Sequence, residues 1–172
     1  QLLFVPLLLQ LFHHSFRHQP RSSQNLVPVF HYDLRDEQHL LTEHLTYVDT
    51  VIHCAGSARV QPSWEHYDEY YLNNISVSHA LFARCQKYGV KTFIYFSSSS
   101  VYGNSLYPTQ LEGDNLAPTN PYAVSKMATE QALMVQAQRG DTRLIIVRPF
   151  TMYGDYMDFG KNGLVIARYL RA

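Results

Sequence analysis

The segment "NPYAVSK", residues 120–126, contains a tyrosine and a lysine four positions apart. On a helix, Tyr122 and Lys126 lie on the same face, with their Cβ atoms about 5–6 Å apart. A phenol with a pKa of about 10 is a poor base at neutral pH, and a nearby positive charge stabilises its phenolate. The pair can therefore act as a general base and its tuning cation, although the same spacing also occurs by chance on many helices.

A serine cluster forms a second candidate for chemistry. The segment "FSSSSVYG", residues 96–103, places four hydroxyl groups directly after an apolar run of strand length. Serines commonly end strands and satisfy the backbone groups of loops, so the cluster alone is a weak signal. The order of the two segments along the chain, each following a predicted strand, favours a site.

The elements that would position these residues follow from the hydrophobic pattern, which alternates short apolar runs with longer amphipathic segments. We expect strands at 26–32, 49–55, 90–97 and 142–150. We expect helices at 36–45, 63–88 and 120–140. The second helix is expected to break near Asn73 and Asn74 and to stop at Gly89. Asn120 as N-cap, the proline after it and Gly140 bracket the third helix.

The strands are apolar throughout, which indicates burial on both faces, and helices between them indicate right-handed parallel crossovers. The sequence therefore predicts an α/β protein with a doubly wound, Rossmann-like parallel sheet. Ligands of such sheets bind outside the carboxyl ends of the strands. The residues at these ends are Asp33, the pair Ala55–Gly56, the serine cluster and Thr151.

Composition limits the classes of partner. The 172 residues correspond to about one domain, and 46% of them are hydrophobic. Fourteen basic residues balance fourteen acidic ones, which argues against non-specific binding of nucleic acid or an anionic membrane. The apolar run Leu2–Phe12 is shorter than the about 20 residues that span a bilayer.

Cysteine and histidine usage points to a reduced compartment without a metal site. Cys54 and Cys85 each fall inside an apolar element, and we interpret them as reduced core thiols of a cytoplasmic protein. His14 and His18 have helical i, i+4 spacing, but no Cys, Asp or Glu lies near them to complete a metal site. We expect these histidines to be exposed.

From about residue 26 onward, the chain resembles the extended short-chain dehydrogenases/reductases, in particular the nucleotide-sugar epimerases and dehydratases. The resemblance rests on six segments in family order: "HYDLRD", "VIHCAG", "NNISVSHAL", "VKTFIYFSSSSVYG", "NPYAVSKMATEQ" and "RPFTMYG". It implies an NAD-dependent enzyme in which a base removes a proton from a sugar hydroxyl while hydride leaves the same carbon for the nicotinamide ring.

The resemblance also implies roles for individual residues. Tyr122 matches the base, and Lys126 matches the lysine that tunes the base and binds the cofactor ribose. Ser98, five residues before Gly103, matches the hydroxyl that shares a hydrogen bond with the reacting group.

Further residues match the family's contacts with NAD. Cofactor-contacting positions correspond here to Asp33, Leu34, Ala55, Gly56 and Pro149. Asn74 matches a helix asparagine that supports the site and the cofactor, and its alternative interpretation is a break or cap inside a helix. The sequence itself does not distinguish NAD from NADP, and the resemblance to the family favours NAD.

The residues after the catalytic hydroxyl favour epimerisation. Family members that dehydrate carry acidic residues there, because expelling water needs an added acid and base. This chain has Ser99 and Ser100 at those positions, and we assign both to substrate binding. The expected reaction is oxidation to a keto intermediate and re-reduction from its other face, at C4. Reduction of a sugar or another carbonyl is the alternative.

The sequence leaves two substrate classes, a UDP-hexose and a UDP-uronate. Thr151, also assigned to substrate binding, stands where the UDP-glucuronate 4-epimerases have threonine. That subgroup places an arginine seven residues later, and this chain has Asp158 there. A like charge repels a uronate unless Lys161 takes the arginine's role.

We expect the chain to be incomplete. No glycine precedes Gly56, so the glycine-rich turn that seats the pyrophosphate on a helix N-terminus is not found. We interpret residues 1–25 as a segment left from the first helix and residues 26–172 as a partial dinucleotide-binding domain, without the first β-α unit and most of the C-terminal substrate domain.

Incompleteness predicts weak NAD binding by these residues. An inactive remnant that acts only as an association module is a further alternative. Relatives form homodimers through the Tyr–Lys helix and the helix at about 73–88, and a full-length protein is expected to do the same.

Overall fold

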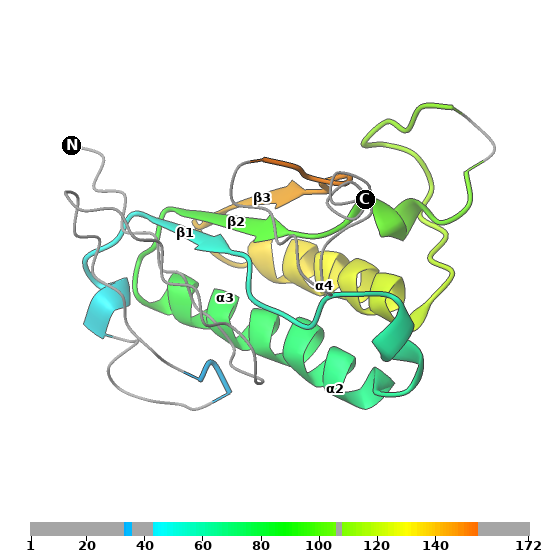
Figure 1. Ribbon diagram of the computed structural model, residues 1–172. Helices are drawn as coiled ribbons and strands as arrows, with labels where there is room; N and C mark the ends of the chain where they lie inside the picture. Colours follow the sequence, from blue (N-terminus) through cyan, green and yellow to red (C-terminus); the bar gives the residue numbers. More distant parts are fainter. Residues whose placement is uncertain (1–32, 36–42, 106–107, 155–172) are drawn as a thin grey trace.

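The computed structural model describes residues 33–35, 43–105 and 108–154 (Figure 1). Its three strands are β1 (Thr50–His53), β2 (Thr92–Phe96) and β3 (Arg143–Val147), and they form one sheet in the order β1-β2-β3. Both neighbouring pairs are parallel, with Phe93 opposite Val51 on one side and Leu144 on the other. The three strands predicted in this part of the chain and their parallel pairing are confirmed, with each strand shorter than expected.

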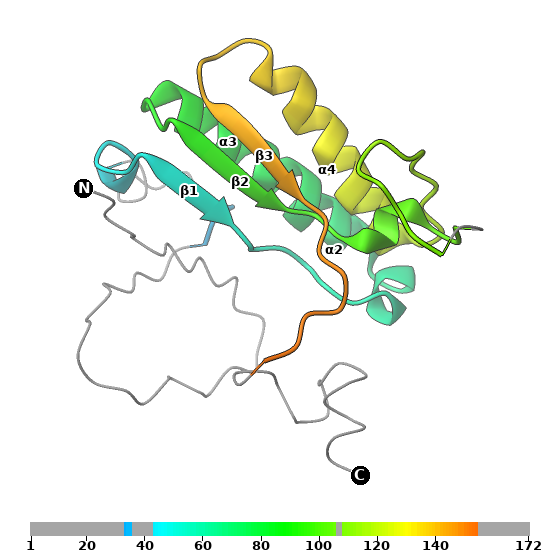
Figure 2. The same ribbon diagram turned by 90° about the horizontal axis from the view of Figure 1, so that it is seen from above.

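The helices α3 (Val77–Lys87) and α4 (Pro121–Ala137) lie in the crossovers between the strands. Figure 2 shows both helices behind the sheet, on one of its faces. On β2, Phe93 and Tyr95 are fully buried, whereas the alternating Ile94 is half-buried. Burial on both faces was expected from the apolar strands. In the described residues, the fully buried positions of β1 and β2 lie on the helix-covered face, where α3 and α4 pack, and β3 is only half-buried.

The core sits between the sheet and these two helices. Phe82 of α3 packs against Phe93 of β2 with ring centroids 5.0 Å apart. Leu81 and Cys85 of α3 and Leu133 of α4 are buried in the same cluster. This apolar layer fixes the two helices against the strands and so sets which residues meet at the end of the sheet.

The segment predicted as one helix over 63–88 consists of four consecutive elements. These are the 3-10 helix η1 (Gln61–Trp64), α2 (Tyr67–Tyr71), the π-helical η2 (Leu72–Ser76) and α3. The irregularity expected near Asn73 and Asn74 is present, but it is a π turn within continuous helix and not an interruption. A π turn inserts one extra residue into the helical ladder, and such turns are frequent at functional sites.

Helix α3 ends as the sequence predicted. Gly89 adopts a left-handed conformation with φ of 77°. The N–H of Val90 donates to the Cys85 carbonyl at 3.0 Å and that of Gly89 to the Gln86 carbonyl at 3.3 Å, the two bonds of a Schellman motif. This stop redirects the chain into β2.

One expectation about the cysteines is wrong, and several other predicted features lie outside the described residues. Cys85 is a buried free thiol, but Cys54 is an exposed one. Cys54 directly follows β1, where Val51 and His53 point to the helices, so strand alternation turns Cys54 away from the core. The strand at 26–32, His14, His18 and most of the helix at 36–45 lie outside the described residues, although 43–45 are helical.

Within the described residues, no helix combines the length and apolar character needed to cross a membrane.

Helix α4 begins with a cap that can be tested. Asn120 has an extended backbone, and its side-chain oxygen accepts a hydrogen bond from the Ala123 N–H at 2.9 Å. The helix ends at Ala137, ahead of the Gly140 stop that the sequence suggested. We expect Asn120→Ala to lower the free energy of unfolding by about 1 kcal/mol, measured by urea denaturation, because this N–H loses its partner.

Asn120→Asp serves as the control for this experiment, because it keeps an accepting oxygen and should retain most of the stability. Equal destabilisation by both variants would contradict the capping role.

Candidate functional site

The candidate site lies where the three parallel strands end. The segments that follow β1, β2 and β3 meet the amino-terminal half of α4 at this edge of the sheet (Figure 1). The strands run in one direction, so residues that are far apart in sequence converge here.

Lys126 is deeply buried at this edge, with 6% of its surface exposed. Its Nζ donates a hydrogen bond to the Phe96 carbonyl at 2.8 Å and lies 4.9 Å from the centre of the Tyr95 ring. Burial lowers the pKa of Lys126 to about 8, while the nearby Cys54 and Glu130 act in the opposite direction. The ammonium group is therefore held at the end of β2 by a carbonyl and an aromatic face.

Tyr122 stands one turn before Lys126 on α4 and is half-buried. Its ring meets that of Tyr70 edge-on, with centroids 6.2 Å apart and planes at 82°. Tyr70 is itself fixed, because its hydroxyl donates to the Ala58 carbonyl at 2.7 Å. Helix α2 thus packs against the side of the Tyr122 ring.

Ser98 is buried two residues after Phe96, the residue that binds Lys126. It caps the short 3-10 helix η3 (Ser99–Tyr102), since its Oγ accepts a hydrogen bond from the Ser100 N–H at 3.2 Å. Ser99 and Ser100 are half-buried within η3. The hydroxyl therefore has the structural role of a strand-end serine and also lies at the same edge as Lys126.

Asn74 connects two parts of the site from within the π turn. Its Oδ1 accepts from the Ser57 N–H at 2.8 Å, and its Nδ2 donates to the Ser57 carbonyl at 3.0 Å and to Ser125 Oγ at 2.8 Å. Thr129 Oγ1 donates to the Asn74 carbonyl at 2.9 Å. The loop after β1 and helix α4 are thus joined through one buried amide.

Gly56 lies in the loop after β1 with φ of 149°. A Cβ atom at this position would lie 2.5 Å from Asn74 Oδ1 and 3.8 Å from Lys126 Nζ. A side chain here would collide with the asparagine, so glycine allows the loop to run close beside both residues. The neighbouring Ala55 is half-buried and packs against the core.

These observations can be set beside known proteins. The family model for the NAD dependent epimerase/dehydratase family matches residues 9–172. The chain belongs to the NAD-dependent epimerase/dehydratase family.

Among curated relatives, the UDP-glucose 4-epimerase of Halalkalibacterium halodurans is 37% identical over 106 residues, which cover 61% of this chain and 32% of that protein. Nucleotide-sugar dehydratases are also among the relatives. The chain thus spans less than half the length of these enzymes.

Solved structures of the family superimpose on this fold. The UDP-N-acetylglucosamine 4-epimerase of Methanobrevibacter ruminantium M1 has a TM-score of 0.77 and 30% identity, covering 84% of this chain and 46% of that one. MoeE5, solved with UDP-glucuronic acid and NAD, has a TM-score of 0.75 and 32% identity, covering 89% and 50%. These matches establish the Rossmann-like fold.

The residues at the edge of the sheet suit the cofactor of this epimerase/dehydratase family, which is NAD. Gly56 brings bare backbone close to the site, and Lys126 offers a donor of charge-assisted hydrogen bonds. Pro149 is half-buried, and its carbonyl accepts from the Ser99 N–H at 3.0 Å, which places it beside the serine cluster.

The other residues that the sequence suggested for the site lie in different surroundings. The Asp33 carboxylate accepts hydrogen bonds from the Arg35 side chain and backbone, which lower the pKa of Asp33. Leu34 is 2% exposed and belongs to the buried core cluster. Thr151 is exposed after β3, and Asp158 and Lys161 lie outside the described residues.

His53 was not singled out from the sequence. It is 1% exposed at the end of β1, with Nε2 2.8 Å from Ser78 Oγ. Burial, with a smaller effect of Lys126, lowers the pKa of His53 to about 3, so the ring is neutral beside the ammonium. Its signal was a polar residue inside the apolar run "VIHCA", a pattern that many core histidines share.

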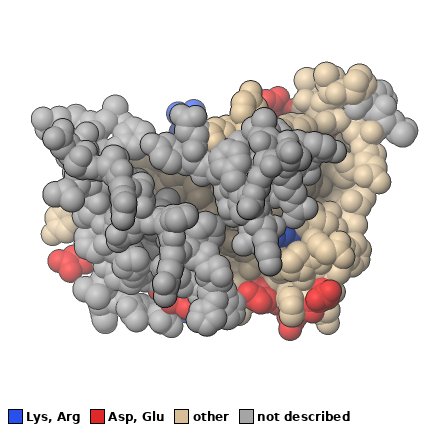
Figure 3. All heavy atoms as spheres, in the orientation of Figure 1, with Lys and Arg blue, Asp and Glu red and all other residues tan. Residues whose placement is uncertain are grey.

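One face of the molecule shows few charged side chains among the described residues (Figure 3). On the face shown in Figure 3, the visible acidic side chains lie mainly along the lower border, and few basic ones are visible among the described residues. The described atoms visible on this face therefore form no basic patch of the kind that attracts anionic ligands from a distance.

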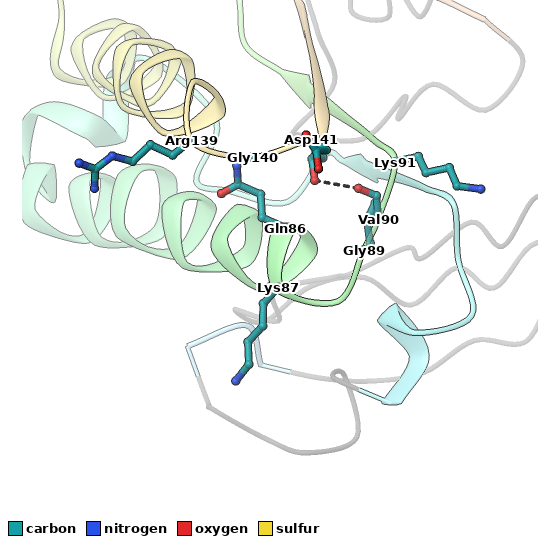
Figure 4. Close-up of a pocket in the computed structure, with 9 residues that line it drawn as sticks. Gln86, Lys87, Gly89, Val90, Lys91, Arg139, Gly140 and Asp141 are labelled. Carbon is teal, nitrogen blue, oxygen red and sulfur yellow. Dashed lines mark hydrogen bonds between the residues drawn. The ribbon is translucent and has the colours of Figure 1, made fainter.

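A pocket of about 410 Å³ lies at the opposite end of the sheet, lined in part by Lys87, Lys91 and Arg139. Figure 4 shows these three side chains pointing in different directions, away from one another. Lys91 also pairs with Asp49 at 2.8 Å. The cations do not converge on a common point, so we place the chemistry at the carboxyl edge of the strands.

The pKa of Lys126 provides a direct test of its burial. In a ¹³C NMR titration of the lysine side chains, we expect the Lys126 signal, assigned by its loss in Lys126→Met, to change with a midpoint at about pH 8. Lys91 serves as the internal control, because its hydrogen bond to Asp49 raises the pKa of Lys91 above 10.5. A Lys126 midpoint near 10.5 would show that the ammonium is solvated.

The same shift predicts a dependence of stability on pH. Between about pH 8 and 10.5, the unfolded chain binds more protons at Lys126 than the folded chain does. The contribution of Lys126 to the free energy of unfolding therefore rises with pH across this range. Urea denaturation of the parent and Lys126→Met should show a difference that moves in favour of the parent, and a constant difference would contradict the shift.

Proposed function

We propose that the protein containing this sequence catalyses NAD-dependent epimerisation of a nucleotide sugar at C4. The observation that carries the proposal is the buried Lys126 ammonium, bound to the Phe96 carbonyl two residues before Ser98 and located on the helix that carries Tyr122. A base, a cation and a hydroxyl therefore gather at the edge where parallel sheets bind their ligands.

In the proposed reaction, Tyr122 removes the proton of a sugar hydroxyl and later returns it. Below about pH 8, Lys126 carries a positive charge at the base of the site, which favours the phenolate of the neighbouring tyrosine. Ser98 shares a hydrogen bond with the reacting hydroxyl and orients it. NAD, when bound, supplies the hydride acceptor. Gly56, Asn74 and Lys126 would hold it beside the sugar.

The serine cluster supports epimerisation over dehydration. Ser99 and Ser100 follow Ser98 directly and cannot act as the acid and base that expulsion of water requires. We propose that they contact the sugar together with Thr151. The substrate class is a UDP-hexose or UDP-uronate, which is supported by relatives named as UDP-glucose 4-epimerases and by the neighbour solved with UDP-glucuronic acid.

We also propose that the full-length protein is a homodimer formed through α3 and α4. Large apolar side chains are exposed on α4 and on the π turn before α3. Leu72 is 48% exposed, Met134 37% and Val135 65%. A second copy of the chain would remove these groups from water.

The catalytic proposal is tested with Tyr122→Phe in the full-length protein, incubated with NAD and a panel of UDP-sugars. We expect the parent to form C4 epimers and the variant to lose at least about 100-fold in kcat, because the general base is removed. Turnover is measured by separating the sugar products. Undiminished epimerisation by the variant would rule out Tyr122 as the base.

Two controls accompany this experiment. Tyr67→Phe changes an exposed tyrosine outside the site and should keep the parental rate. The thermal transition of Tyr122→Phe should match that of the parent. Formation of a reduced sugar with consumption of NADH, in place of an epimer, would support the reductase alternative.

The dimer is tested with Val135→Glu, which places a charge in the exposed apolar patch of α4. We expect sedimentation velocity to show a dimer for the full-length parent and a monomer for the variant, because burying an unpaired charge is unfavourable. Gln138→Glu, beyond the end of α4, is the matched control. A dimer of unchanged stability in Val135→Glu would place the interface elsewhere.

A further inference from the structure

A second buried charge lies close to the candidate site. Glu130 on α4 has no exposed surface. Its carboxylate accepts hydrogen bonds from Arg148 Nη2 at 2.7 Å, from Arg148 Nε at 3.0 and 3.1 Å, and from the Ser97 hydroxyl. Burying a carboxylate is costly unless it is paired and hydrogen-bonded, and here both oxygens have partners.

Arg148 extends the network beyond the carboxylate. Its Nη1 donates to Tyr102 Oη and to the Glu112 carbonyl, both at 3.0 Å. The guanidinium carbon lies 5.1 Å from the centre of the Tyr102 ring. One arginine after β3 therefore binds α4, the 3-10 helix η3 and the loop that follows it.

Stability alone is a weak explanation for this pair. Replacing a buried ion pair with apolar residues is often neutral or stabilising, so such pairs are better explained by what they position. Glu130 stands one turn after Lys126 on α4. Its partner Ser97 lies between Phe96, which Lys126 binds, and Ser98.

We propose that Glu130 and Arg148 are a positioning pair that holds Ser97, and with it Ser98, against the helix carrying Tyr122 and Lys126. The proposal rests on the function assigned above to these three residues. In this proposal, the Glu130 carboxylate attaches Ser97 and Ser98 to α4.

The bond between Ser97 and Glu130 matters because few side-chain bonds in the described structure join this loop to α4. In the described structure, two side-chain bonds join residues 96–98 to α4: Lys126 to Phe96 and Ser97 to Glu130. Without the second bond, the Lys126 ammonium makes the remaining side-chain bond between these residues and α4, while backbone bonds still join the loop to β3 and Pro149. Small displacements of a reacting group cost large factors in rate.

The proposal is tested first by hydrogen exchange, which needs neither cofactor nor turnover. The Ser99 N–H, bonded to the Pro149 carbonyl, reports the position of the loop. In the 172-residue chain, we expect Ser97→Ala to accelerate its exchange about tenfold, while Ser97→Thr, which keeps the hydroxyl, stays within about twofold of the parent. Amides of β1 should be unaffected, and Ser76→Ala controls for loss of an exposed hydroxyl.

A kinetic measurement on the full-length protein gives the second readout. We expect Ser97→Ala to lower kcat about tenfold with KM within about twofold of the parent, and Ser97→Thr to restore most of kcat. A purely structural role would instead lower the amount of folded enzyme and leave kcat per folded molecule unchanged.

Two hydrogen-exchange results would overturn the positioning role: unchanged Ser99 exchange in Ser97→Ala, or equal acceleration throughout the sheet. A kcat that Ser97→Ala leaves intact would do the same. If the parent turns over no UDP-sugar, the proposed function fails on its own, and the exchange experiment still decides whether Glu130 holds the loop.

Discussion

The side-chain amide of Asn74 is the interaction on which the rest of the site depends. It binds both backbone groups of Ser57 and the hydroxyl of Ser125, so it joins the loop after β1 to α4, the helix that carries Tyr122 and Lys126. The π turn gives the helix the extra residue that brings this amide inward, and Gly56 leaves room for it. A cofactor lying along the loop would thereby be held in register with Tyr122 and Lys126.

The buried ionisable side chains at this edge of the sheet carry different charges. Burial lowers the pKa of Lys126 to about 8, so its amine is protonated at neutral pH, where a carbonyl and an aromatic ring are its partners. His53 is buried and neutral, and the Glu130 charge is matched by Arg148. Lys126 is therefore a buried cation at this edge that can stabilise a phenolate. An enzyme that stabilises a transient anion benefits from a cation fixed in advance of the reaction.

Residues close together in the sequence predicted the helices and strands well. Contacts between residues far apart in the sequence were not predicted. The Asn120 cap and the Gly89 stop are decided by residues a few positions apart, and the structure contains both. The π turn was anticipated only as an irregularity, because its register depends on Asn74 reaching Ser125, 51 residues away. Cys54 was misplaced since β1 ends one residue before it. The Glu130–Arg148 pair was missed because neither residue is unusual in its own segment.

NMR mapping of NAD onto the ¹⁵N-labelled chain tests the location of the site most directly, since chemical shifts report weak binding at millimolar cofactor. We predict the largest shifts at the amides of Gly56, Ser57 and Ser98, at the carboxyl edge of the strands. Shifts confined to Gly89 and Gly140, at the pocket on the opposite edge, would contradict it.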